Sequence, residues 1–163
     1  MPKRQRVQAG SSNMVVAMQR PRDKTIQTVL LTTSTTQQDN TLVTADGPCT
    51  IQGLRWQFNF SGPTTSADTC YWAIYRLKEG YSIPTMDLTN GNQLIEPEQE
   101  VITWGTLRTL DRDAGTGPGV LHQEGSTKSM RKLMKGDRLI LSVLAGSAAS
   151  GRFDGAVQYF CAF

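Results

Sequence analysis

From Thr25 onward the chain holds many short segments rich in Val, Ile, Thr, Trp, Tyr and Phe, and in one of them apolar and polar residues alternate with a period of two. In segment 51–60 (IQGLRWQFNF), every second residue from Leu54 to Phe60 is large and apolar, and the residues between them are polar. A period of two is typical of a strand with one face in a core and the other in water. Little helical periodicity interrupts this pattern, so we expect an all-β body.

Eight segments rich in β-branched and aromatic residues are the candidate strands, and glycine-containing turns separate many of them. They are residues 26–33, 41–45, 51–60, 69–78, 101–110, 127–134, 138–145 and 155–163. Segment 69–78 (TCYWAIYRLK) is apolar on both faces for most of its length, so we expect each of its faces to be covered. The connections at 79–100 and 111–126 are predicted to be long loops.

Eight short strands with unequal loops favour a single eight-stranded jelly-roll sandwich, with an immunoglobulin-like sandwich as the rival. In a jelly roll, the last strand lies in the interior of one sheet, between segments 26–33 and 51–60. This placement explains why the chain ends on aromatic sequence, because a terminal strand held between two neighbours does not fray.

The charge of the chain is modest overall, at +3, but it is unevenly distributed. Residues 1–24 hold six basic side chains and one acidic one, whereas residues 25–163 hold 11 basic and 13 acidic ones. We therefore expect a short basic N-terminal arm at 1–24 and one jelly-roll domain at 25–163. A basic arm favours contact with a polyanion, although a solvated tail or an import signal has the same composition. The candidate nucleic-acid-binding residues of the arm are Lys3, Arg4, Arg6, Arg20, Arg22 and Lys24.

A second basic segment, KSMRKLMKGDR, covers residues 128–138. Such a charged strand is expected at a sheet edge, where charge discourages stray pairing with other strands. The functional alternative is a second patch that faces phosphate together with the arm. Its candidate residues are Lys128, Arg131 and Lys132.

Signs of catalysis or of a bound cofactor are scarce. His122 has no recognisable partner for nucleophilic chemistry, and we expect no enzyme activity. Cys49, Cys70 and Cys161 lack metal-ligand spacing and are expected to be buried as small apolar side chains, so we expect no cofactor and no structural metal. The acidic run at 96–100 is predicted to be a solvated loop, with cation binding as the alternative. The chain also has no apolar run long enough for membrane insertion.

The C-terminal sequence GSTKSMRKLMKGDRLILSVLAGSAASGRFDGAVQYFCAF resembles the ending of capsid proteins from small circular, replication-protein-encoding single-stranded DNA viruses of the circovirus and nanovirus type. A basic strand, a Lys-Gly-Asp-like turn, an apolar strand, a small-residue loop and an aromatic last strand follow one another in the same order. Segments IQGLRWQFNF and YWAIYRL resemble the middle strands of that family, so the likeness covers roughly residues 51–163. The arm is shorter and holds fewer arginines than in the circovirus-like members.

The resemblance implies a coat protein that assembles with itself into an icosahedral shell of about 60 copies and packages single-stranded DNA. It also implies location in the virion, passage through the host nucleus during assembly, and a host receptor that the sequence does not identify. The alternative from another class is a cellular jelly-roll carbohydrate-binding module. Such a module would use an exposed tryptophan, Trp72 or Trp104, as a sugar platform, whereas core packing is the ordinary role of each.

Overall fold

The computed structural model describes residues 22–33, 36–61, 69–86, 100–108, 120–128, 131–146 and 151–162. Nine strands and no helix lie within these ranges. The strands are β1 (Arg22–Thr33), β2 (Gln38–Thr44), β3 (Cys49–Ser61), β4 (Thr69–Leu77), β5 (Val101–Arg108), β6 (Val120–Thr127), β7 (Arg131–Leu133), β8 (Arg138–Ala145) and β9 (Gly151–Ala162). The predicted all-β class is confirmed.

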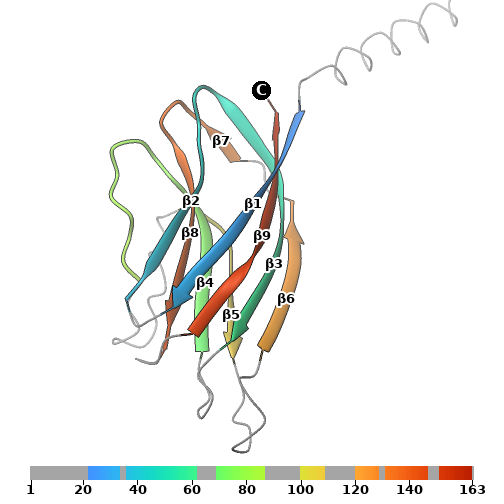
Figure 1. The fold of residues 1–163 in the computed structure, drawn as a ribbon. Helices are drawn as coiled ribbons and strands as arrows, with labels where there is room; N and C mark the ends of the chain where they lie inside the picture. The colour runs from blue at the N-terminus through green and yellow to red at the C-terminus, as the bar shows by residue number, and fades with distance from the viewer. Residues whose placement is uncertain are drawn as a thin grey trace, which may run out of the picture.

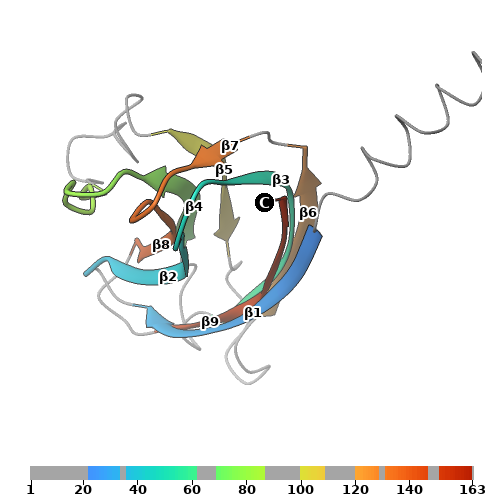
Figure 2. The same ribbon diagram turned by 90° about the horizontal axis from the view of Figure 1, so that it is seen from above.

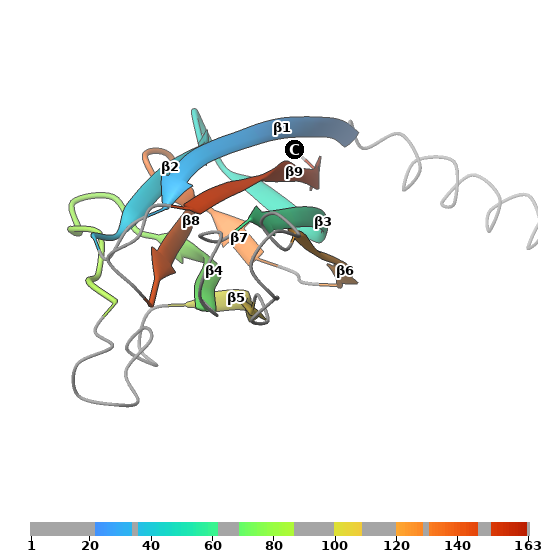
Figure 3. The ribbon, with the colours of Figure 1, turned by 60° about the horizontal axis from the view of Figure 1, so that its bottom comes forward.

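The strands form two antiparallel sheets that pack against each other as a β-sandwich (Figures 1 and 2). The first sheet has the order β1-β9-β3-β6, and the short strand β7 also pairs with β3. The second sheet has the order β2-β8-β4-β5. Seen from below in Figure 3, β1 and β9 lie in one layer, and β8, β4 and β5 lie in the other.

The first half of the chain pairs with the second half in reverse order. Strand β1 pairs with β9, β2 with β8, β3 with β6 and β7, and β4 with β5. Two further pairings, of β9 with β3 and of β8 with β4, join these ribbons side by side into the two sheets. Every pairing among the described strands is antiparallel, and all but that of β4 with β5 join strands that are not consecutive in the sequence.

The last strand lies in the interior of the first sheet, as predicted from its aromatic sequence. Strand β9 is hydrogen-bonded to β1 along one edge and to β3 along the other. Gly155 in β9 has a φ of +154°, and a Cβ atom at this position would collide with the backbone carbonyl oxygen of Gln57 in β3. Close approach of the two strands therefore requires glycine at this position.

Aromatic side chains from both sheets meet in the core between them. The ring of Trp72 lies 4.9 Å from that of Phe58 and 5.5 Å from that of Trp56, measured between centroids. Phe58 also packs on Phe153, at 4.8 Å. These residues come from β3, β4 and β9, so the alternation seen in the sequence places them on the inner faces.

Strand β4 is covered on both faces, as its two-sided apolar sequence predicts. Its inner face joins the main core, and its outer face forms a second buried cluster with Ile140, Leu144 and Met86. Gln37 holds the segment that carries Met86 against the sheet: its side-chain oxygen accepts from the Met86 amide at 2.6 Å, and its amide group donates to the Pro84 carbonyl at 3.0 Å.

Several predicted boundaries were wrong, among them the start of the last strand, which begins at Gly151 and not at residue 155. Residues 120–126, predicted as part of a loop, belong to β6, because pairing with β3 orders a polar segment that has no apolar alternation of its own. The predicted strand 127–134 is divided between the end of β6 and β7, so the described residues hold nine strands where eight were expected. Strand β1 begins at Arg22, inside the predicted arm, because its pairing with β9 extends to Ala162.

Candidate functional site

The start of β1 and the basic strand β7 lie at the same end of the first sheet. Arg22 pairs with Ala162, Ala162 with Thr50, and Thr50 with Lys132, so one row of the sheet links the arm to β7. Three strand spacings separate the ends of this row, or about 14 Å. In Figure 1, the end of β9, the beginning of β1 and β7 all lie at the top of the sandwich.

The candidate residues of the second basic segment do not all point the same way. Lys128 and Lys132 are exposed, whereas Arg131 is partly buried and shares a face of β7 with the core residue Leu133. The Arg131 Nε atom is buried and has no hydrogen-bond partner among the described residues. Within the described part of the chain, β7 pairs only with β3, which agrees with the predicted edge position. Only Lys128 and Lys132 of this set are therefore free to meet a ligand in solvent.

The arm itself is described only from Arg22 onward. Arg22 and Lys24 are residues of β1, in register with Ala162 and Phe160. Lys3, Arg4, Arg6 and Arg20 lie outside the described residues. The structure thus brings two of the six arm residues to the end of the sandwich where β7 lies.

A buried aspartate, which the sequence interpretation did not single out, holds two turns together at this end. Asp137 is 4% exposed and accepts hydrogen bonds from the backbone amides of Met134 and Glu79, at 2.9 and 3.1 Å. The guanidinium of Arg76 donates to the same carboxylate at 3.1 and 3.2 Å. Turn 78–81 and turn 134–137 are consequently fixed against each other.

The electrostatics of this contact favour the charged carboxylate. Burial by itself raises the pKa of Asp137, but the amides of Met134 and Glu79 and the guanidinium of Arg76 outweigh it and lower the pKa below its ordinary value. Arg76 also pairs with Glu100 at 3.0 Å, and Lys78 lies 3.7 Å from that carboxylate. Glu100, the last residue of the acidic run, therefore serves in an ion pair, whereas residues 96–99 lie outside the described part.

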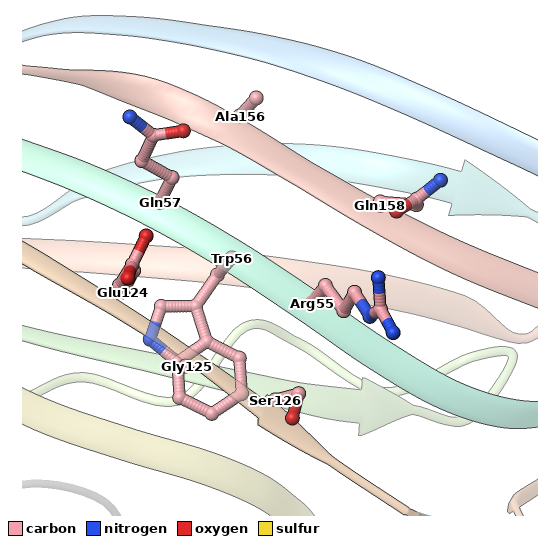
Figure 4. A pocket seen from close by; sticks show the side chains of 8 residues that line it. All are labelled: Arg55, Trp56, Gln57, Glu124, Gly125, Ser126, Ala156 and Gln158. Carbon is pink, nitrogen blue, oxygen red and sulfur yellow. The ribbon is translucent and has the colours of Figure 1, made fainter.

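The outer face of the first sheet is polar and slightly hollowed (Figure 4). An open depression of about 530 Å³ is lined on this face by Arg55, Gln57, Glu124, Ser126, Ala156 and Gln158, together with Trp56 and Gly125, which alternate with them along β3 and β6. One row further along, the Nδ1 atom of His122 lies 2.8 Å from the side-chain oxygen of Asn59, and the amide of Asn59 donates to Asp154 at 2.9 Å. This face offers hydrogen-bonding groups, and its contacts among the described residues include no set of acid, base and nucleophile.

The cysteines and tryptophans have distinct environments. Cys49, Cys70 and Cys161 are buried, as predicted, and burial raises the pKa of the Cys49 thiol. No group of three metal-ligating side chains occurs among the described residues. Trp72 is in the core, with its indole donating to Gln123 at 3.0 Å, whereas Trp104 on β5 is 62% exposed. Trp104 is thus the one of the two candidate sugar platforms that is accessible.

Within the described residues, no helix is both long and apolar enough to cross a membrane.

Comparisons with known proteins add little to this description. No family model and no curated protein matches the chain. Among solved structures it is similar to one described as "Bacillus endospore appendages form a novel family of disulfide-linked pili", at 9% identity and a TM-score of 0.40, over 89% of this chain and 91% of that one. It is also similar to a chain of infectious bursal disease virus, Gx strain, at 9% identity and a TM-score of 0.22, over 86% of this chain but 39% of that one. At these values neither likeness carries an argument about family or function.

Proposed function

We propose that the protein is a viral coat protein that assembles with itself into a closed shell and packages single-stranded DNA through basic residues. The sequence resemblance over residues 51–163 supports this proposal, together with two features of the structure. The first is the strand order, and the second is the position of the basic residues.

The strand order fits a jelly roll if β6 and β7 are counted as one interrupted strand. Four nested antiparallel pairs then run from β1 with β9 to β4 with β5, which is the pattern of a folded ribbon closed into two four-stranded sheets. Both β6 and β7 pair with the same strand, β3, in adjacent parts of its length. Jelly rolls are common both in viral capsids and in lectins. The fold is therefore compatible with a coat protein and with a carbohydrate-binding module, and it does not distinguish them.

The row from Arg22 to Lys132 is the observation that carries the packaging proposal. The start of β1 at Arg22 and the exposed Lys132 of the second basic segment lie at the same end of the first sheet. Their positive electrostatic potentials add there. If the basic residues of β7 only protected a sheet edge from stray pairing, they would not need to lie near the start of β1. Contacts between lysine or arginine and phosphate carry little sequence information and weaken as salt is added, so we expect packaging to be unspecific and salt-sensitive.

The test compares two sets of charge removals in assembled particles. One variant replaces Lys3, Arg4 and Arg6 with alanine, and the other replaces Lys128 and Lys132, leaving the partly buried Arg131 in place. Arg152→Gln is the matched control, since it removes one positive charge at the opposite end of β9. We expect both multiple variants to lower the absorbance ratio of packaged nucleic acid to protein, and the control to leave it unchanged. If neither multiple variant changes the ratio, the packaging proposal is wrong.

The exposed Trp104 favours a second candidate function, a carbohydrate-binding module. Its indole is 62% exposed on a sheet, and aromatic faces of this kind stack on sugars. Particle size distinguishes the two candidates: closed particles in electron micrographs support the coat protein, and small species that bind glycans through Trp104 support the module. Trp104→Ala would abolish glycan binding only in the second case.

A further inference from the structure

Another aromatic residue, Tyr81, stands exposed among cations at the basic end of the sandwich. Its side chain is 63% exposed, the highest value among the large apolar residues of the described chain. The backbone around it is held in place: the Tyr81 amide donates to the Lys78 carbonyl at 3.2 Å, and Arg138 donates to the Tyr81 carbonyl at 3.2 Å. An exposed ring on a fixed backbone costs little entropy when it binds a flat partner.

The cations come from the two turns that Asp137 joins. Lys78 belongs to the first turn, and Lys135 and Arg138 flank Asp137 in the second. We call Lys78, Tyr81, Lys135 and Arg138 the Tyr81 platform. Glu79 is the acidic side chain whose carboxylate reaches the second turn, where it lies against Gly136. Lys78 also lies 3.7 Å from the Glu100 carboxylate, so Lys78, Lys135 and Arg138 counted against Glu79 and Glu100 leave a net charge of +1, with Lys135 and Arg138 as the cations that Glu100 does not pair.

We infer that the Tyr81 platform binds single-stranded nucleic acid, with one base stacked on the Tyr81 ring and the neighbouring phosphates near Lys135 and Arg138. This inference rests on the proposed function, and it names Tyr81 as the residue that stacks on a base of the packaged nucleic acid. Proteins that bind single strands without sequence preference combine a positive surface with aromatic rings, since every base has a face that stacks. The platform follows Lys132 by three residues at Lys135, so one strand of nucleic acid can run from β7 onto it.

The composition of the platform favours nucleic acid over another protein. The cores of protein interfaces are depleted in lysine, and two of the four platform residues are lysines. Trp104 provides the contrast, because it is equally exposed but its cross-strand neighbour is Ala73 and the adjacent exposed residue of its strand is Thr106. Exposure of an aromatic ring is common to both sites, and the cations distinguish them.

The experiment measures binding of a fluorescein-labelled oligothymidylate to the full chain by anisotropy at several salt concentrations. We expect Tyr81→Leu to weaken binding about tenfold without changing the salt dependence, because it removes stacking and no charge. Tyr81→Phe keeps the ring and should bind like the wild type. Lys135→Ala should reduce the slope of log affinity against log salt by about 1. Trp104→Leu, the matched control, should have no effect.

Light scattering and thermal melting of the same samples separate the alternatives. Wild-type affinity in Tyr81→Leu overturns the inference, and so does a variant that binds the oligonucleotide normally but no longer assembles, since Tyr81 would then contact another copy. If the wild-type chain does not bind the oligonucleotide at all, the packaging proposal itself fails. Photo-crosslinking with a bromodeoxyuridine oligonucleotide gives an independent result: we expect the crosslink at Tyr81, and a crosslink at Trp104 would contradict the assignment.

Discussion

Replacing Asp137 tests whether one buried carboxylate fixes the basic end of the sandwich. The carboxylate accepts two backbone amides and two guanidinium contacts, and the Arg76 side chain that it neutralises is only 16% exposed. Removal of one partner from a buried charged pair costs about 3–5 kcal/mol, since the other charge is left without compensation. For a domain with about 5–15 kcal/mol of stability, Asp137→Ala should therefore remove a large part of it.

Urea unfolding followed by tryptophan fluorescence measures this loss, because Trp72 lies in the core. At an m-value of about 2 kcal/mol per molar urea, the expected loss moves the midpoint by about 2 M. Asp154→Asn is the matched control: it removes a carboxylate that pairs with the exposed Arg152 at 2.8 Å, so it should cost no more than about 1 kcal/mol.

The pH dependence gives a second, independent check. The folded pKa of Asp137 is lowered, so its contribution is complete above the ordinary aspartate pKa of about 4 and is lost as the pH falls through the folded pKa. Asp137→Asn cannot titrate at this position. The stability difference between wild type and Asp137→Asn should accordingly shrink between pH 7 and pH 3. A difference that stays constant, or an Asp137→Ala variant within 1 kcal/mol of wild type, would refute the reasoning.

Three further outcomes are expected. Deletion of residues 157–163 should abolish cooperative thermal unfolding measured by circular dichroism, because it removes a strand paired on both sides together with the buried Val157 and Tyr159; native-like melting would contradict the interior placement. Gly155→Ala should yield insoluble or unfolded protein in a solubility assay, since its Cβ collides with the Gln57 carbonyl, whereas Gly47→Ala, where a Cβ meets nothing within 4 Å, should be soluble. The three cysteines should react with a thiol reagent at pH 8 only after unfolding, because all are buried and burial raises the pKa of Cys49; rapid labelling of the native protein would show this to be wrong.

The sequence alone determined the features that depend on short-range patterning. Alternation in 51–60 placed Leu54, Phe58 and Phe60 in the core, and the two-sided apolar pattern of 69–78 correctly predicted that β4 is covered on both faces. The aromatic ending predicted the interior position of β9. These predictions succeed because the side-chain period of a strand and the cost of exposing apolar surface act locally.

Contacts between distant parts of the chain determined the remaining features, namely strand β6, the row from Arg22 to Lys132 and the burial of Asp137. Strand β6 is polar and carries Gly125, so its own residues give no strand signal, and it becomes a strand because β3 supplies hydrogen-bond partners along its whole length. The row from Arg22 to Lys132 joins residues 110 positions apart through two intervening strands, and only the register of those strands brings them together. Asp137 reads as an ordinary turn residue in the sequence, and only the packing of turn 78–81 against it makes it a buried carboxylate with four donors. Contacts of this kind depend on distant parts of the chain, which no local pattern encodes.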